Sequence, residues 1–393
     1  MIDFTLSAND RAMLEAIRSE GELARKYARY YDEHEDELTP DMLPGASQLP
    51  ARHELMAQPS SEDSSGAVIA MLLTAARTWG DYAVQPRRGK GALGNAALHA
   101  AGTEAQKERW GQLTLAMAIT EPGCGSDTSA IQTSAVLDGD DWVLNGEKIF
   151  VTTGVRCEGA VIWATTDKRA GRAGIRSFLV LKGTPGFIVA HKEKKLGIRA
   201  DDTASFVFQD CRIPRDQLLG GERSVQHTGP GGGYRNVLQT FNITRPAVAA
   251  LGLGIAQAAL DFTREQLRTA GEPVDTFDVD SSTPPSSAVT QFQRLETLHE
   301  AAMLTVLRAA WLSDRGQPNN VEASIAKAKG GAAAREITQG CIQLLGPLAI
   351  SREHLLEKWF RDARITDLYE GTGQIQNLII ARAILGFGRD ALS

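Results

Sequence analysis

The spacing of hydrophobic residues changes twice along the chain, and this change constrains the fold more than any other feature. From about residue 7 to 110, apolar residues recur at the spacing of amphipathic helices. Between about 115 and 219 they form short β-rich runs such as SFLVL and ASFVFQD. From about 237 onward the helical spacing returns in long runs.

This order predicts an α+β multidomain protein. The expected parts are an N-terminal α-helical domain over residues 1–115, a middle antiparallel β domain over 116–219 and a C-terminal α-helical bundle over 220–393. The middle domain is predicted to be a barrel or a sandwich. The pairs Asp138-Gly139 and Asn145-Gly146 are predicted turns between its strands.

Composition and charge exclude several classes of protein. The chain has a net charge of −6 and a pI near 5.7, so it offers no basic surface to a nucleic acid. Its longest apolar stretch, around residues 67–76, is too short to span a membrane, and the N-terminus lacks the features of an export signal. Four widely spaced cysteines and scattered histidines predict neither disulfides nor a metal site. We therefore expect a cytoplasmic protein without a membrane span.

Two glycine-rich segments look like nucleotide-binding motifs but lack the required residues. No strand is predicted before Gly252-Leu253-Gly254, and Gln257 occupies the position of the third glycine, which favours packing between helices. The run GPGGGY is not followed by Lys-Ser/Thr. It belongs to the segment 220–234, which together with 271–287 is predicted to form long loops, either functional or inert.

The segment AITEPGCGSDTSA, residues 118–130, joins the first helical block to the first strand. Pro122, Gly123 and Gly125 bend the chain there and expose consecutive backbone N–H groups. With nearby hydroxyl groups, these donors are suited to a diphosphate or the edge of a flavin. The alternative is an ordinary turn capped by Asp127.

A second unusual junction lies near the C-terminus. Tyr369 and Glu370 come directly before Gly371-Thr372-Gly373, after which an apolar helix is predicted. Glycine backbone allows a ligand to approach closely, so a carboxylate here can face a cleft. The alternative is that Glu370 caps the helix that follows.

Four motifs occur in order along the chain: AITEPGCGSD, WVLNGEKIFVT, FNITRP and RDARITDLYEGTGQIQ. In this combination they resemble the acyl-CoA dehydrogenase family, over nearly the whole chain and with the same α–β–α order. The resemblance implies an FAD-dependent flavoprotein of fatty acid and lipid metabolism. Such an enzyme converts an acyl-CoA to the trans-2-enoyl-CoA and passes electrons to an electron-transferring flavoprotein. It also implies a homotetramer, or a heteromer with a related subunit.

The resemblance assigns binding roles to residues in each motif. The implied FAD contacts are Met117, Ile119, Thr120, Gly125, Ser126, Phe150, Val151, Thr152, Gln343, Thr372 and Gln374. The implied substrate contacts are Ser126, Phe241, Asn242, Thr244, Arg245, Tyr369 and Gly371. Many relatives carry Trp where this chain has Phe150.

The family keeps its catalytic glutamate at one of two positions, before the Gly-Thr of the last motif or just before the arginine of the FNITRP-type motif. This chain has Glu370 at the first and Thr244 at the second. The resemblance therefore implies that Glu370 removes the α-proton of the thioester while N5 of FAD accepts the β-hydride. It assigns to Arg245 the role of helping to position Glu370.

Two motifs that contact a neighbouring subunit's FAD in the family are altered here. The Arg-x-x-Phe-Gly motif reads LRTAG, with Leu267 and Ala270 at the Arg and Phe positions, although Arg268 is adjacent. The Gln-x-x-Gly-Gly motif reads QLLGP, so Pro347 removes a backbone donor. A partner chain supplies the missing contacts, the 271–287 segment replaces them, or FAD is held less tightly.

Two other functions remain to be distinguished from this one. An acyl-CoA oxidase of the same fold passes its electrons to O₂. A silent assembly subunit would need neither Glu370 nor Arg245, both of which are present. No motif encodes the length or branching of the acyl chain.

Overall fold

The structure is a computed structural model that describes residues 5–49, 66–89, 91–221, 232–275 and 285–388, without the side chains of 232–243. The chain divides into two compact units. The helical unit comprises Met1–Arg88, Lys195–Ala200 and Asn242–Ser393, and the sheet unit comprises Gly89–Lys194 and Asp201–Phe241. The three domains predicted from the sequence, with limits at 115 and 219, stay a prediction.

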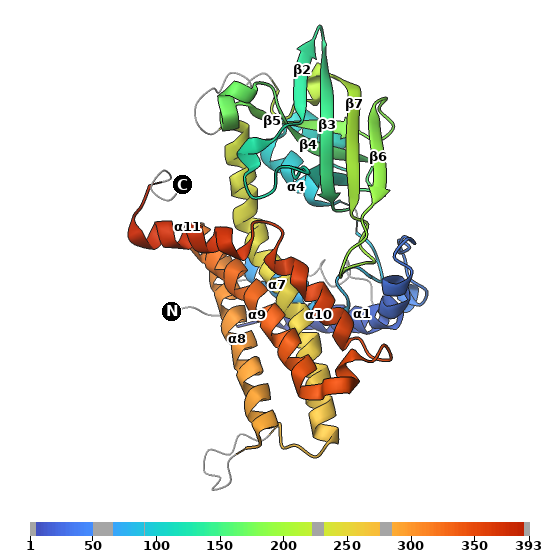
Figure 1. Cartoon of the computed structure of the whole chain (residues 1–393), viewed down its shortest axis with the longest axis vertical. Helices are drawn as coiled ribbons and strands as arrows, with labels where there is room; N and C mark the ends of the chain where they lie inside the picture. Colours follow the sequence, from blue (N-terminus) through green and yellow to red (C-terminus); the bar gives the residue numbers. More distant parts are fainter. Residues whose placement is uncertain (1–4, 50–65, 90, 222–231, 276–284, 389–393) are drawn as a thin grey trace. The chain divides into compact units, whose positions relative to one another are not determined.

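The helical unit is built mainly from long helices that pack along one another (Figure 1). Its helices are α1 (Ala8–Glu33), α3 (Gly66–Gly80), α7 (Gly232–Thr269, which begins in the sheet unit), α8 (Ser287–Asp314), α9 (Asn320–Leu345), α10 (Leu356–Ala363) and α11 (Gly373–Leu385). The short 3₁₀ helices are η1 (Ala46–Gln48), η5 (Gly346–Ile350) and η6 (Arg364–Asp367). The shared core is rich in alanine, which allows close approach of the helices α3, α7, α8 and α9.

The glycines of the Gly252-Leu253-Gly254 run serve that close approach. A Cβ atom on Gly254 would lie 2.1 Å from the carbonyl oxygen of Ala75 on α3, and one on Gly252 would lie 2.7 Å from Oγ1 of Thr366 on η6. The predicted packing role of these glycines is confirmed. The same helix contains a stretch, Thr244–Thr269, that is long and apolar enough to cross a membrane, but 72% of the relevant window is buried inside the protein.

The sheet unit carries seven strands in the order β1-β4-β2-β3-β7-β6, with β5 paired to β4. They are β1 (Leu115–Ala118), β2 (Ser134–Asp138), β3 (Asp141–Val151), β4 (Gly159–Thr165), β5 (Ile175–Leu181), β6 (Phe187–Lys192) and β7 (Ala204–Pro214). The helices α4 (Leu93–Ala101) and α5 (Glu104–Trp110) precede them, and the 3₁₀ helices η2 (Thr128–Ala130), η3 (Lys168–Gly174) and η4 (Arg215–Gln217) lie between or after strands. Figure 1 shows β2, β3, β7 and β6 side by side.

The helix–strand–helix order predicted from the sequence is confirmed, with two corrections inside the sheet. First, β4 pairs in parallel with both β1 and β2, whereas antiparallel pairing was predicted throughout. Alternation of apolar residues shows which face of a strand is buried, but it does not show strand direction. Second, Asn145-Gly146 is not a turn, because it lies inside β3, where the register with β7 shifts. Asp138-Gly139 does begin the tight turn between β2 and β3.

The two predicted long loops fall partly outside the described residues. In the first, residues 222–231 lie outside the description and α7 begins at Gly232. In the second, 276–284 lie outside it, while Gly271 and the residues up to Asp275 follow the end of α7. Whether these segments are functional is therefore not tested.

Candidate functional site

The sheet unit brings together the two stretches that the resemblance assigned to the flavin. The backbone N–H of Ile149, at the end of β3, donates to the carbonyl oxygen of Thr120 at 2.9 Å. Thr120, which follows β1, therefore lies beside the β3 residues that lead to Phe150 and Thr152. Sequence separation between these stretches is large, so the sheet, and not local structure, creates the juxtaposition.

A buried ion pair joins β3 to the residues that follow β1. The Nζ atom of Lys148 lies 2.7 Å from Oε1 of Glu121 and 3.0 Å from the carbonyl oxygen of Ile119. The Glu121 carboxylate also accepts the backbone N–H groups of Gln132 at 2.7 Å and Thr133 at 3.0 Å. Burial alone would raise the pKa of Glu121, but Lys148 and these donors lower it below its usual value. Burial lowers the pKa of Lys148 to about 8 despite the attraction of Glu121.

Near this pair in the sequence, part of the surface is exposed and the backbone is strained at Phe150 and Thr153. Phe150 is 60% exposed with φ +56°, and Thr153 has φ +62°. Positive φ is unusual for residues with a side chain and concentrates at functional sites. Gly125 and Ser126 are exposed, and a Cβ atom on Gly125 would meet nothing within 4 Å. An exposed aromatic ring beside hydroxyl groups and accessible backbone fits a flavin, whose ring system is planar and whose diphosphate is anionic.

Three further residues with implied FAD contacts contribute to the cores of the sheet unit. Met117 and Ile119 are half-buried and pack against one core cluster, and Val151 is buried in another. Asp127 does cap a turn, since its Oδ1 accepts the N–H of Ser129 at 3.0 Å at the start of η2. The capped turn and the open surface coexist, because the cap uses Asp127 and leaves Gly125 and Ser126 exposed.

In the helical unit, Glu370 occupies a strained turn between η6 and α11. Its φ is +58°, and Gly371 follows with φ +87°. The carboxylate Oε2 accepts a hydrogen bond from Oγ1 of Thr244 on α7 at 3.0 Å. Desolvation raises the pKa of Glu370 above its usual value, whereas Thr244, Arg245 and Lys327 act to lower it. Glu370 is thus a carboxylate with increased proton affinity.

Glu370 does not cap the helix that follows it. Thr372 is the N-cap of α11, and its hydroxyl oxygen accepts the N–H of Ile375 at 3.4 Å. Gln376, which is fully buried, donates from Nε2 to the carbonyl oxygens of Gly371 at 3.1 Å and Glu370 at 3.4 Å. The first residues of α11 therefore hold the turn, and the carboxylate of Glu370 takes no part in capping the helix.

The residues around the Glu370 turn come from the segment that follows α3, from α7 and from α9. The hydroxyl groups of Tyr369 and Tyr82 share a hydrogen bond of 3.0 Å. Arg245 is 8% exposed, and its Nη1 donates to Oγ of Ser324 on α9 at 3.5 Å. Phe241 and Asn242 belong to α7, but their side chains lie outside the described residues. Gln374 is exposed on α11.

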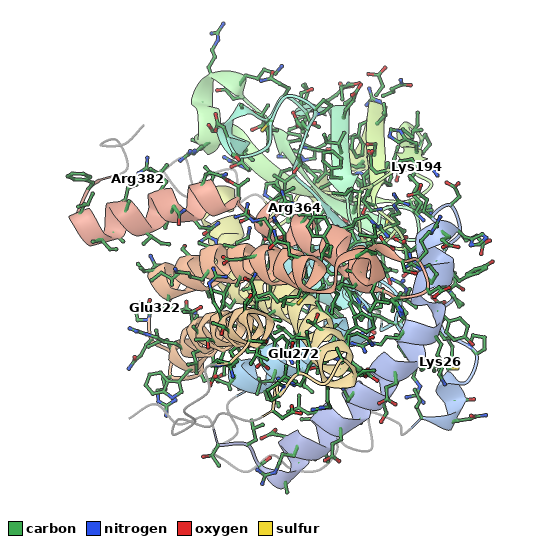
Figure 2. All side chains as sticks on the ribbon, turned by 60° about the horizontal axis from the view of Figure 1, so that its bottom comes forward. Lys26, Lys194, Glu272, Glu322, Arg364 and Arg382 are labelled. Carbon is green, nitrogen blue, oxygen red and sulfur yellow. The ribbon has the colours of Figure 1, made fainter. Side chains whose placement is uncertain are left out.

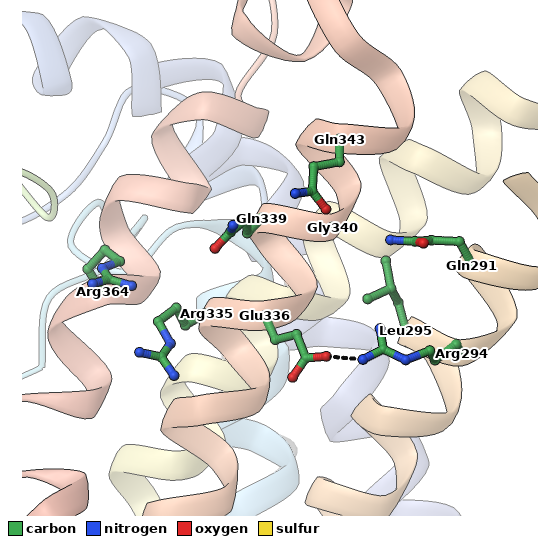
Figure 3. A pocket seen from close by; sticks show the side chains of 9 residues that line it. All are labelled: Gln291, Arg294, Leu295, Arg335, Glu336, Gln339, Gly340, Gln343 and Arg364. Carbon is green, nitrogen blue, oxygen red and sulfur yellow. Dashed lines mark hydrogen bonds and ion pairs between the residues drawn. The ribbon is translucent and has the colours of Figure 1, made fainter.

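Gln343 lines a separate cavity of about 300 Å³ between α8, α9 and η6 (Figure 3). Three arginines, Arg294, Arg335 and Arg364, share it, and Arg294 is paired with Glu336. Figure 2 marks Arg364 among the other side chains of the unit. Neither Glu370 nor Thr244 lines this cavity.

The residues of the two altered motifs take defined places in the helical unit. Leu267 is 6% exposed and belongs to the helical core, where an arginine would be buried. Arg268 forms a two-pronged ion pair with Asp275, with N···O distances of 2.6 and 2.7 Å. Pro347 stands at the start of η5. The arginine next to the altered motif is thus already engaged within its own chain.

Sequence reasoning did not identify several residues that build these sites. They are Glu121, Lys148, Gln376 and Lys327. For the two lysines, a charged residue next to apolar ones was the available signal, because Lys148 directly precedes Ile149 and Phe150 in β3 and Lys327 lies in the helix run ASIAKA. Within the described residues, no group of three or more His, Cys, Asp or Glu side chains is placed to hold a metal ion.

Comparisons with known proteins agree on one family. Residues 116–211 match the acyl-CoA dehydrogenase middle domain and 231–385 match the acyl-CoA dehydrogenase C-terminal domain. The human mitochondrial short-chain specific acyl-CoA dehydrogenase is 39% identical over 293 residues, which cover 72% of this chain and 67% of the relative. Butyryl-CoA dehydrogenase from Megasphaera elsdenii is 28% identical, with TM-score 0.79 over 98% of this chain and 100% of its own. A chain from a structure of the electron transferring flavoprotein of Acidaminococcus fermentans is 27% identical, with TM-score 0.77 over 99% and 100%.

Proposed function

Because the chain belongs to the acyl-CoA dehydrogenase family and is an FAD-dependent enzyme that acts on acyl-CoA, we propose that Glu370 is the base that removes the α-proton, leading to the trans-2-enoyl-CoA. Bound FAD supplies the acceptor for the β-hydride. The observation that carries this proposal is the Glu370 carboxylate itself, which is partly buried, has a raised pKa and takes no part in capping α11.

The environment of Glu370 suits a general base for a weak carbon acid. A carboxylate in water has too little proton affinity to remove an α-proton at a useful rate, and desolvation increases that affinity. The hydrogen bond from Thr244 at 3.0 Å fixes the direction in which Oε2 points. The backbone N–H of Glu370 is the donor that we assign to the thioester oxygen, where negative charge develops during proton removal.

In the sheet unit we assign the flavin to the open surface around Phe150. Thr120 and Thr152 would hold its edge by hydrogen bonds, Gly125 and Ser126 would contact the diphosphate, and Phe150 would pack against the ring. The exposure of Phe150 and Gly125 and the positive φ of Phe150 support this assignment. Thr372, Gln374 and Gln343 stay predicted FAD contacts, and Tyr369, Gly371, Phe241 and Asn242 stay predicted substrate contacts.

We further propose a homotetramer that passes electrons to an electron-transferring flavoprotein in the cytoplasm. At the end of α11, Ile384 is 74% exposed, Leu385 59% and Phe387 48%, and such an apolar group is typical of a surface that another subunit covers. The similarity to a chain from the electron transferring flavoprotein structure supports the electron acceptor. The core position of Leu267 and the engaged Arg268 favour one alternative, a heteromer whose partner supplies part of the FAD site.

An anaerobic titration of the purified holoenzyme with acyl-CoA thioesters tests the proposed function. We expect the flavin absorbance to bleach with at least one member of a panel that begins with butyryl-CoA and extends to long, branched and ring-bearing chains. An absorbance that stays unchanged with every member would contradict the proposal. The mass and FAD content of the chain expressed alone separate the homotetramer from the heteromer, because a chain without its partner would be poor in FAD.

A further inference from the structure

Lys327, in the first half of α9, is a buried cation without a hydrogen-bonding partner among the described residues. Its side chain is 0% exposed, and within the described residues its Nζ atom has no acceptor. Buried ammonium groups are normally paired, because leaving water costs more than any packing of the side chain returns. A lysine that departs from this rule next to a candidate active site calls for a functional explanation.

The contacts of its neighbours on α9 show which way Lys327 faces. Ser324, three residues earlier, accepts a hydrogen bond from Arg245 of α7. Gly331, four residues later, lies so close to η6 that a Cβ atom there would be 3.0 Å from the Cα atom of Asp367. Residues three and four apart share one face of a helix. Lys327 therefore faces the elements that carry Arg245, Asp367 and Glu370.

The charges around Lys327 come from the same elements. Asp367 and Glu370 attract its ammonium group and Arg245 repels it, and no charged group of α8, α10 or α11 within the described residues acts on it appreciably. On Glu370 in turn, Lys327 and Arg245 are the two cations that oppose the effect of burial. Thr244 adds its hydrogen bond to the same carboxylate.

We propose that Lys327 is a positioning residue for Glu370, whose positive charge keeps the carboxylate in the ionised, proton-accepting form before the substrate is bound. Burial gives Glu370 its proton affinity, but burial without a cation would also favour the protonated form, which cannot accept the α-proton. Lys327 limits that effect without bonding to the carboxylate, which stays free to receive the α-proton. The inference rests on the proposed role of Glu370 as the base.

The variant Lys327→Met tests this inference, with Lys329→Met as its control. Met has nearly the length of Lys and suits an apolar core, so Lys327→Met is expected to fold. Lys329 lies two residues away on α9 and is exposed, so the same substitution there removes an equal charge from the surface. Lys327→Arg restores a cation at the site.

Two measurements decide the outcome. The first is the pH dependence of flavin reduction, whose acid limb should move up by about one pH unit in Lys327→Met, the size of effect that a nearby opposite charge has on a carboxyl group. The second is an infrared titration of the carboxyl band of Glu370, identified by its loss in Glu370→Gln, which needs no substrate and should show the same displacement. Lys329→Met should match the wild type, and Lys327→Arg should return both midpoints toward it.

An unchanged infrared midpoint in Lys327→Met would overturn the proposal, as would an equal displacement in Lys329→Met. A lower melting temperature with an unchanged midpoint would assign Lys327 to packing alone, and would also overturn it. If none of the acyl-CoA thioesters reduces the flavin of the wild type, the proposed function fails. The infrared midpoint still decides the link between Lys327 and Glu370 in that case.

Discussion

Thr244 donates a hydrogen bond of 3.0 Å from its Oγ1 to Oε2 of Glu370, and so joins the middle of α7 to the turn before α11. The resemblance to the family implies a catalytic glutamate at one of these two positions. In this chain the second position carries a hydroxyl group that supports the carboxylate at the first.

Replacing Thr244 by Val should leave the Glu370 carboxylate less well oriented and raise its pKa further, because the lost hydrogen bond both directs Oε2 and favours the ionised form. The two side chains have nearly the same shape, and we expect roughly a tenfold fall in kcat from the lost orientation, with the acid limb of the pH profile moved to higher pH. Stopped-flow measurement of flavin reduction checks this. Thr269→Val, at the exposed end of α7, is the control. Equal rates in the two variants would remove Thr244 from the site.

Glu370→Gln should abolish turnover and leave FAD bound. We expect a loss greater than the roughly 10²–10⁴-fold usual for a general base, because no second carboxylate occupies the alternative position. Activity and flavin content, measured on the same preparation, test both parts. Retention of more than a few per cent of the wild-type rate would reject Glu370 as the base.

The same variant should be more stable than the wild type at neutral pH. The pKa of Glu370 is higher in the folded protein than in the unfolded chain, so the folded state binds the proton more tightly. The free energy of unfolding therefore decreases as the pH rises through the interval between the two pKa values, and ionised Glu370 costs stability above it. Thermal melting of Glu370→Gln should give a higher Tm at neutral pH, with the difference vanishing in acid. A lower Tm would mean that Glu370 stabilises the fold.

Lys327 should show the opposite dependence on pH. Burial lowers its pKa from 10.5 to about 8, so between these values the unfolded chain holds a proton that the folded chain has released. The wild type therefore gains stability over this interval, and the advantage in free energy of unfolding that we expect for Lys327→Met below pH 8 should shrink toward pH 10.5. Denaturant unfolding of both proteins across that range measures it. A constant difference would show that Lys327 does not titrate there.

The ion pair of Lys148 and Glu121 should be essential to the FAD surface. Lys148→Met leaves a buried carboxylate with backbone donors but no cation, which typically costs about 3–5 kcal/mol. We expect a lower Tm and loss of FAD on gel filtration. The double variant Lys148→Met with Glu121→Gln removes both charges and should recover much of the Tm. Failure of the double variant to recover would point to packing by the lysine side chain.

The apolar end of α11 should be needed for assembly. Leu385→Glu places a charge on a surface that we propose is covered in the oligomer, so native mass spectrometry should show smaller species. Val136→Glu, on β2 with nearly the same exposure, 60% against 59%, should leave the mass unchanged. An intact oligomer in Leu385→Glu would exclude this surface as the interface.

The sequence alone predicted the order of the elements and the motifs on which the candidate site is built, because periodicity and local glycine chemistry decide both. It did not predict that Asn145-Gly146 lies within a strand, because pairing with β7 overrides the local preference for a turn. It also missed Lys327 and Gln376, whose roles arise only when α9 and α11 are packed beside the residue-370 turn. The burial of a lysine is a tertiary property that no short motif reveals.

Gln376 ties the carbonyl oxygens of the Glu370 turn to the first residues of α11, while the opposite end of that helix presents Ile384 and Leu385 to its surroundings. A helix is stiff along its axis, so a subunit seated on the far end, as we propose, would also restrain the loop that carries the carboxylate. Dissociation of the proposed assembly would release both ends together, and specific activity would then fall with dilution.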